Sequence, residues 1–306
     1  MKKYIVTGAS GFIGKALVKE LLNRNNKVFA ITTNKNNLSD LSRYKNLDII
    51  EANYSDYEKI KDEELYNIDG FYHLAWEGAY GKKSIDIKIQ LNNIDGAIKA
   101  IELAQNIKCK KFLLAGTVAE LEIIEHIDKN VCSPRNVCIY ANSKLSAEMF
   151  CKIIAYNGNI EFNSALLANT FGVGDYSMRS TNFILSKLIK DEPLKLVAGT
   201  QLNDWIYIDD TIKLLIATME KGKHLKTYYI GHKKLRSLRE IISEARDILN
   251  PNMILNFGEL EDTFITNYDY TDLNALYNDT GEEANVDFKY SILKTAEWIK
   301  EGMNNV

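Results

Sequence analysis

Thr7-Gly8-Ala9-Ser10-Gly11-Phe12-Ile13-Gly14 is the stretch of sequence that decides the fold. It follows an apolar run, Lys3–Val6, that predicts a strand, and it opens an amphipathic stretch, Ile13–Asn23, that predicts a helix. Farther along the chain, short β-branched runs alternate with helical stretches. We expect strands at 27–32, 47–51, 70–75, 111–115 and 163–167, and helices at 92–106 and 141–156. This alternation predicts an α/β fold, a doubly wound parallel sheet with helices on both faces.

The glycines of the opening turn are spaced to bind the pyrophosphate of a dinucleotide. Gly8 would permit a tight turn, Gly11 would let the backbone approach a phosphate, and Gly14 would let helix and strand pack closely. The helix N-terminus would then face the negative charge, with contacts expected from Ser10, Phe12 and Ile13. The spacing is G-x-x-G-x-x-G, and an ordinary strand-to-helix turn is the alternative interpretation.

The second half of the chain has a mixed pattern. A short strand is expected at 205–208, and helices are expected at 209–221, 238–249 and 292–303. No internal repeat, low-complexity tract or linker separates two parts. We therefore expect interleaved domains. Residues 1–168 and about 202–230 would form a dinucleotide-binding Rossmann domain, and residues about 169–201 and 231–306 a smaller α+β substrate lobe.

Composition and charge narrow the classes of function. The chain has 306 residues, of which 46% are apolar and 26% charged, as in ordinary globular proteins. Its net charge of −3, with Lys and Glu interspersed, leaves no basic patch for nucleic acid, and no apolar stretch could span a membrane. The cysteines lack metal-ligand spacing, so we expect no metal and a cytoplasmic protein with mostly buried free thiols at Cys109, Cys132, Cys138 and Cys151.

A second motif, Tyr140-Ala141-Asn142-Ser143-Lys144, places a phenol and an ammonium on one face of a predicted helix. A free phenol has a pKa of about 10. A neighbouring ammonium and an oxidised nicotinamide would lower that pKa toward neutrality. Tyr140 is therefore the candidate general acid/base, and Lys144 would hold the nicotinamide ribose. A surface Tyr and Lys are the alternative, which the glycine turn disfavours.

These motifs resemble those of the extended short-chain dehydrogenase/reductases that act on nucleotide sugars, within the NAD-dependent epimerase/dehydratase family. The resemblance extends to about Leu249, and it implies cofactor contacts at Leu74 and Ala75 and a homodimer formed through two helices per subunit. The matching segments are Thr7–Gly14 (T-G-x-x-G-F-I-G), His73–Ala75 (H-L-A), Asn93–Gly96 (N-x-x-G), Tyr140–Lys144 (Y-x-x-x-K) and Gln201–Asp210 (Q-x-R-D-[FW]-x-Y-V-x-D).

The resemblance also implies a third catalytic group, Thr117, whose hydroxyl would donate to the substrate ketone. A Thr that merely ends a strand is the alternative. Related 4,6-dehydratases carry an Asp-Glu pair just after this Thr, and some epimerase-reductases carry a cysteine two residues on. Val118 and Ala119 stand in those places, so simple hydride transfer is expected. Glu120 could contact a sugar hydroxyl, but we expect a solvated loop carboxylate.

The residues after the second strand favour NADPH over NADH. NAD-binding proteins usually place an acidic residue there, whereas this chain has Thr33, Asn34 and Lys35, which can bind a 2′-phosphate. Lys35 can equally be an ordinary loop lysine, so NAD(H) stays open. After the third strand, Asn53 replaces the family's adenine-contacting Asp and keeps an acceptor oxygen, and Tyr54 follows it.

Several residues are expected to bind a nucleotide-diphospho sugar. The resemblance implies Asn169 for the diphosphate, and Asn182 with Phe183 for the base and phosphate. Asn203 stands where the family commonly has Arg, which weakens a diphosphate contact. Arg179 is a candidate replacement, since a guanidinium can bind phosphate oxygens bidentately.

An aromatic loop with Trp76 and Tyr80 follows the fourth strand and either covers the sugar or packs between the lobes. The combined motifs predict an NADPH-dependent reductase of the C4 ketone of a nucleotide-diphospho deoxysugar, in surface-polysaccharide sugar biosynthesis. The alternative enzyme is an NAD-dependent 4-epimerase, which keeps its cofactor bound. A non-catalytic dinucleotide-binding regulator is the third interpretation, and the presence of both Tyr140 and Lys144 argues against it.

Overall fold

A seven-stranded parallel sheet forms the centre of the computed structural model, which describes residues 1–60, 65–130, 135–136, 138–177, 179–261 and 266–304. Its strand order is β11-β6-β5-β4-β1-β2-β3, and each neighbouring pair runs parallel. The strands are β1 (Lys3–Thr7), β2 (Lys27–Thr32), β3 (Leu47–Glu51), β4 (Gly70–His73), β5 (Lys111–Thr117), β6 (Glu161–Leu167) and β11 (Lys226–Ile230). This confirms the predicted doubly wound α/β fold.

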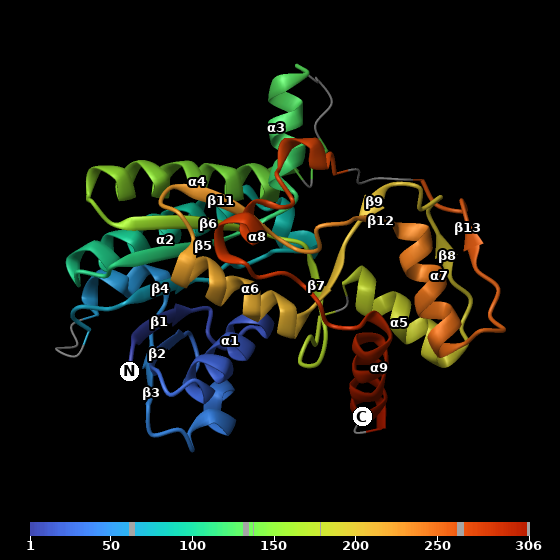
Figure 1. Ribbon diagram of the computed structural model, residues 1–306, viewed down its shortest axis with the longest axis horizontal. Helices are drawn as coiled ribbons and strands as arrows, with labels where there is room; N and C mark the ends of the chain where they lie inside the picture. Colours follow the sequence, from blue (N-terminus) through green and yellow to red (C-terminus); the bar gives the residue numbers. More distant parts are fainter. Residues whose placement is uncertain (61–64, 131–134, 137, 178, 262–265, 305–306) are drawn as a thin grey trace.

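Helices cover both faces of the sheet (Figure 1). On one face lie α2 (Ile87–Asn106) and α4 (Cys138–Asn157), and on the other lie α1 (Phe12–Asn23) and α6 (Ile208–Lys221). A further helix, α3 (Glu120–Asp128), follows β5. Short 3-10 helices connect the elements: η1 (Lys35–Leu41), η2 (Tyr54–Lys59), η3 (Gly81–Ile85) and η4 (Tyr268–Tyr270).

The alternation of side chains along each strand explains this layering. Successive residues of a strand point to opposite faces, and a parallel sheet buries both. Ile5 packs with Phe71 and Phe112 in the cluster beneath α2 and α4, whereas its neighbour Tyr4 packs with Tyr72 in the cluster beneath α1 and α6. The two cores are therefore separated by the sheet itself.

A smaller group of elements lies beside the sheet, on the right of Figure 1. Its helices are α5 (Ser180–Lys190), α7 (Leu238–Leu249) and α9 (Phe288–Asn304), and α8 (Ala275–Thr280) packs against α6 and β11. Three two-stranded sheets join it: β7 (Asn169–Phe171) with β10 (Trp205–Tyr207), β9 (Leu202–Asn203) with β12 (Arg236–Ser237), and β8 (Lys195–Leu196) with β13 (Asn256–Phe257).

Several predicted boundaries differ from the structure. The fourth strand ends at His73 instead of Ala75, which frees the following residues to form a loop. The helix predicted from Asn92 begins at Ile87, because the Asp86 side chain caps it there by accepting from the Ile89 N–H (3.1 Å). Residues 87–91, before the predicted start, alternate apolar and polar, a pattern typical of a strand. The elements β11 (Lys226–Ile230), α3, α5 and α8 were not predicted from the sequence pattern. Of the four cysteines, Cys109, Cys138 and Cys151 are buried and free, and Cys132 lies outside the described residues.

Candidate active site

The glycine turn joins β1 to α1 and is tightly packed. Gly8 has φ +65°, and a Cβ there would lie 2.7 Å from the Ala75 backbone nitrogen. A Cβ on Gly14 would lie 2.9 Å from the Gly8 carbonyl carbon and closer still to its oxygen. The Gly11 N–H donates to the Gly8 carbonyl (3.0 Å). Side chains at Gly8 or Gly14 would therefore force the turn apart from the loop after β4 or from itself. The cleft opens at this turn, where a dinucleotide phosphate can lie against the start of α1.

Hydrogen bonds fix this turn against the ends of β2 and β4. The Thr32 hydroxyl donates to the Ser10 hydroxyl (2.8 Å), and the Thr7 hydroxyl is bonded to His73 Nδ1 (2.8 Å). Burial, and after it the Lys144 charge, lowers the pKa of His73 to about 3, so its imidazole is neutral. The loop after β4, which begins with Leu74, is thereby held next to the turn.

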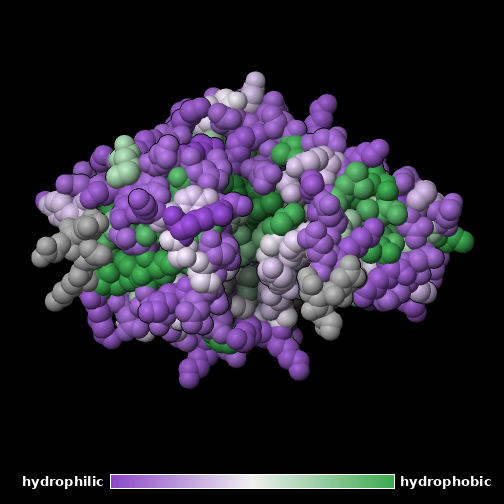
Figure 2. Space-filling view, turned by 90° about the horizontal axis from the view of Figure 1, so that it is seen from below, coloured by the Kyte–Doolittle hydropathy of each residue, from purple (hydrophilic) through white to green (hydrophobic). Residues whose placement is uncertain are grey.

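Thr117, Tyr140 and Lys144 line the same cleft as the glycine turn. Thr117 ends β5, and the other two side chains lie one turn apart on α4. The cleft has a volume of about 1360 Å³, and Figure 2 looks into the hollow from below, with hydrophobic side chains deep inside it. The Thr117 hydroxyl is hydrogen-bonded to the Tyr140 phenol. Thr117 and Tyr140, from two separate segments, therefore meet in the cleft that Lys144 also lines.

The electrostatics of this group differ from the expectation. Burial raises the pKa of Tyr140 to about 12, opposed by the Thr117 hydrogen bond and the positive charge of Arg179. We expected Lys144 to supply that charge. Its ammonium instead donates to the Ala115 carbonyl (2.7 Å) and lies 3.8 Å above the Trp76 ring. Burial lowers the pKa of Lys144 to about 7, and Glu120 opposes the shift.

The aromatic loop after β4 contributes directly to the cleft. Trp76 and Tyr80 both line it. The Trp76 indole N–H donates to Gln90 (2.9 Å), and its ring meets the Tyr140 ring edge to face at 6.3 Å. Trp76 therefore packs on two of the three candidate catalytic residues, and it is partly buried against the core beneath α2.

The residues predicted to bind the adenosine end lie outside the cleft lining. Thr33, Asn34 and Lys35 are exposed, and Asn34 caps η1 by accepting from the Asn36 N–H (3.0 Å). The Lys35 N–H donates to Glu51 at the end of β3 (2.9 Å). A carboxylate thus lies beside the end of β2, which sequence analysis of β2 alone missed.

Two further residues assigned to the adenosine end act locally as caps or packing partners. Asn53 caps η2 by accepting from the Tyr54 N–H (2.8 Å). Tyr54 packs directly against Gly96 of α2: a Cβ added to Gly96 would lie 2.9 Å from the Tyr54 Cβ. Ala75, whose N–H points at the Thr7 hydroxyl (3.4 Å), lies against the turn.

The predicted substrate residues divide into two groups. Asn169 and Arg179 line the cleft. Asn203 lies behind Asn169 and accepts from its side-chain amide (2.8 Å). Asn182 and Phe183 are not part of the lining. The buried Asn182 donates to the carbonyls of residues 175 and 177, so it fixes the preceding loop, and Phe183 is 41% exposed elsewhere on α5.

Other residues of the cleft carry no motif that predicts them from the sequence. Tyr176 and Trp298 meet edge to face at 5.0 Å and form part of its wall, together with Asp209 and Lys213. Trp298 comes from α9, more than eighty residues after the last matching segment, and only its place among regularly spaced apolar residues is visible in the sequence. Glu120 was predicted wrongly as a solvated loop residue. It is 1% exposed, begins α3, and accepts the Thr117 N–H (2.7 Å).

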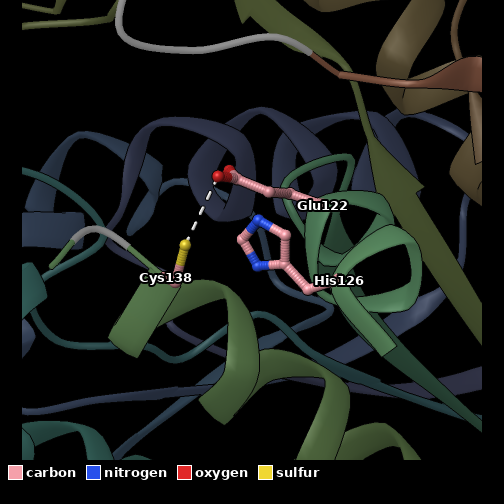
Figure 3. Close-up of side chains that lie close together, drawn as sticks. All are labelled: Glu122, His126 and Cys138. Atoms are coloured by element: carbon pink, nitrogen blue, oxygen red, sulfur yellow. Dashed lines mark hydrogen bonds between the residues drawn. The ribbon is translucent and has the colours of Figure 1, made fainter. Parts of the chain in front are cut away.

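A possible ligand cluster lies between α3 and α4, where Glu122, His126 and Cys138 place donor atoms within 4.8 Å of one another (Figure 3). The Cys138 thiol donates to Glu122 (3.3 Å), and the Arg135 guanidinium donates to both Glu122 oxygens (2.7 Å each). A cation would therefore have to displace a guanidinium from the carboxylate. Burial, followed by Glu122, raises the pKa of the Cys138 thiol. We assign no metal to this cluster.

A statistical model of the NAD-dependent epimerase/dehydratase family matches residues 4–231. The chain belongs to this family. It is 26% identical to a dTDP-4-dehydro-6-deoxyglucose reductase of Escherichia coli, over 83% of this chain and 84% of that protein. It is 28% identical to a CDP-abequose synthase of Salmonella typhimurium, over 85% and 86% of the two chains.

Among solved structures, a UDP-glucuronic acid 4-epimerase from Bacillus cereus has the same fold. Its TM-score is 0.79 at 22% identity, and the likeness covers 98% of this chain and 99% of that one. Family membership makes this chain a nicotinamide-dependent enzyme. In the part of the chain that the structure describes, no helix combines the length and apolar character needed to cross a bilayer.

The residues present fit a nicotinamide dinucleotide. Gly8, Gly11 and Gly14 line the cleft beside the start of α1, so the backbone of the turn can approach a phosphate there. When bound, the nicotinamide supplies or accepts a hydride. This chain's own groups can do the rest: Tyr140 can give or take a proton at a substrate oxygen, Thr117 can hold that oxygen, and the buried Lys144 can place a positive charge nearby.

Proposed function

We propose that this enzyme uses NADPH to reduce the C4 ketone of a nucleotide-diphospho deoxysugar, in the biosynthesis of surface-polysaccharide sugars. The observation that carries the proposal is the meeting of Thr117 and Tyr140 in one cleft with the glycine turn. Positions 118 and 119 hold Val and Ala, so the carboxylate pair used for dehydration is not in place there. Reduction needs only a hydride, a proton and a held oxygen.

The cleft also offers contacts for a diphosphate. Arg179 lies immediately before α5 and lines the cleft, and its charge reaches the Tyr140 phenol. Asn169 lines the same wall and is oriented by Asn203. A guanidinium and an amide that line the same cleft as the acid/base suit a sugar nucleotide whose ring lies at Tyr140 and whose diphosphate lies at Arg179.

The proposed preference for NADPH rests on Lys35. Its backbone is held by Glu51, and its exposed side chain leaves from the end of β2, near the position where the cofactor's ribose lies in this fold. A lysine there can pair with a 2′-phosphate.

The alternative is an NAD-dependent 4-epimerase, and one observation favours it. The Glu51 carboxylate lies at the end of β3, beside the end of β2, where a carboxylate suits a ribose 2′-hydroxyl better than a phosphate. The same Thr117 and Tyr140 groups serve oxidation as well as reduction, because acid/base catalysis is reversible.

The decisive experiment measures NADPH absorbance while the purified enzyme is mixed with 4-keto nucleotide sugars of different bases. Any cofactor that copurifies is identified by mass spectrometry. We expect stoichiometric NADPH oxidation with at least one ketosugar. Tightly bound NAD, together with interconversion of C4 epimers and no net oxidation, would establish the epimerase instead.

We also propose that the enzyme is a cytoplasmic homodimer. The helices α2 and α4 lie side by side on one face (Figure 1), and their outer sides expose apolar residues. These are Ile87, Leu91, Met149, Phe150 and Ile153, each between 49% and 60% exposed. A second copy of the same face would cover them with like side chains. Light scattering should give the mass of two chains, and a single-chain mass would refute the proposal.

A further inference from the structure

Two buried carboxyl groups face each other beneath the cleft. Glu120 on α3 is 1% exposed and Glu148 on α4 is 4% exposed. Their side chains are hydrogen-bonded to one another. Glu120 Oε2 meets no N–H or O–H donor in the described part of the chain. Two carboxylates in contact cannot both be ionised at modest cost, so a proton between them satisfies this oxygen.

The other oxygen of Glu120 holds the end of β5. Its Oε1 accepts a hydrogen bond from the Thr117 N–H (2.7 Å). Thr117 is the residue whose hydroxyl contacts the Tyr140 phenol. The carboxyl occupies the space beside Gly116, where a Cβ would lie 2.7 Å from Oε1. The backbone of the catalytic threonine is therefore fixed by a buried side chain that is itself outside the cleft lining.

Glu148 completes the connection to α4 and β11. It accepts from the Thr227 hydroxyl (2.6 Å) and pairs with Lys152 (2.5 Å). Glu148 lies one helical turn after Lys144, on the same face of α4. The carboxyl pair thus joins the strand that carries Thr117 to the helix that carries Tyr140 and Lys144.

We propose that Glu120 is a positioning residue, which shares one proton with Glu148, clamps the Thr117 backbone, and leaves a single negative charge behind Lys144. This role rests on the proposed hydride transfer at Thr117 and Tyr140. A neutral Glu120 donates to Glu148 and accepts from Thr117 at once, which an amide can also do. The single charge on the pair favours the ammonium form of Lys144.

The hydrogen bond from Thr117 to Glu120 is tested with the variants E120A and E120Q. The control is E125Q, because Glu125 lies on the same helix but pairs with Lys129. We expect E120A to lower kcat by about 10²-fold with little change in KM, because small displacements of a group that holds a reacting atom have effects of that size. E120Q should recover most of that loss, and E125Q should match the wild type. A fully active E120A, or an E120Q as slow as E120A, would overturn the proposal. If E120A does not fold, the E120Q result alone decides.

The charge is tested by the pH profile of kcat/KM. The described ionisable groups around Lys144 and the pair are His73 on β4, Tyr140, Cys151 and Lys152 on α4, and Arg179 before α5. E120Q leaves the charge on Glu148, so its profile should match the wild type. The double variant E120Q/E148Q removes the charge, and its alkaline limb should move to lower pH. A shift in E120Q alone, or none in the double variant, contradicts the shared proton.

An infrared measurement separates this proposal from the proposed function. At neutral pH the wild-type enzyme should show the carbonyl band of a protonated, buried carboxylic acid, and E120Q should lack it. The band does not depend on turnover. An enzyme that shows the band but oxidises no NADPH would refute the ketoreductase while leaving the carboxyl pair intact. Absence of the band in the wild type refutes the pair.

Discussion

The packing of Gly14 against Gly8 predicts that replacing Gly14 by Ala destabilises the protein, whereas helix propensity alone predicts that it stabilises the protein. Gly14 lies in the first turn of α1, where replacing Gly by Ala in an exposed helix would stabilise the protein by about 1 kcal/mol. A Cβ at Gly14 would lie 2.9 Å from the Gly8 carbonyl carbon, whereas ordinary contact begins at 3.4 Å. The Gly8 carbonyl oxygen would lie closer still, so the turn must shift by about an ångström. Overpacking of this kind costs about 1–3 kcal/mol.

We expect G14A to lower the free energy of unfolding by about 1–2 kcal/mol and to weaken cofactor binding at least about tenfold, equivalent to 1.4 kcal/mol. Urea unfolding gives the first quantity and quenching of protein fluorescence by NADPH the second. The control is G302A on α9, where nothing lies within 4 Å of the added Cβ. A G14A protein with wild-type stability and affinity would refute the packing argument.

Four further predictions concern the chemistry, the pH dependence, the cofactor and the assembly. Y140F should lower kcat by about 10²–10⁴-fold while cofactor affinity in a fluorescence titration stays unchanged; a Y140F enzyme with normal kcat would remove Tyr140 as the acid/base. Burial depresses the pKa of His73 from 6.5 to about 3, so below pH 6.5 only the unfolded chain gains its proton and stability should fall by up to about 1.4 kcal/mol per pH unit. Urea unfolding of H73Q should show a smaller pH slope, and an identical slope would contradict the assignment. K35A should raise the KM for NADPH about tenfold, equivalent to about 1.4 kcal/mol, and should change the KM for NADH little. Equal changes in the two KM values would exclude a 2′-phosphate contact. F150E should give single chains in light scattering, and an unchanged mass would place the interface elsewhere.

The sequence predicted those elements whose pattern is local. The bounds of β2, β3 and α7 agree with the prediction, because β-branched runs and an amphipathic pattern report directly on burial. The start of α7 is further fixed by a capping box between Ser237 and Glu240. By contrast, β11 is a short edge strand that becomes recognisable only through its pairing with β6.

The candidate site was predictable only where spacing carries the chemistry. The glycine turn and the Tyr140–Lys144 pair lie within single segments, so their geometry follows from one turn or one helix. The direction of the Lys144 ammonium depends on Trp76 in the loop after β4 and on the Ala115 carbonyl of β5. The burial of Glu120 depends on Glu148, which lies 28 residues later in the chain. Contacts of this kind have no local pattern.

The most direct test of the central claim follows the hydride itself. NADPH carrying deuterium at the transferred position is supplied with a 4-keto nucleotide sugar, and the product is analysed by mass spectrometry and NMR. We predict one deuterium at C4 of the sugar for each NADPH oxidised. A product without deuterium at C4, or sugars that interconvert while the NADPH is not consumed, would contradict the reduction at this cleft.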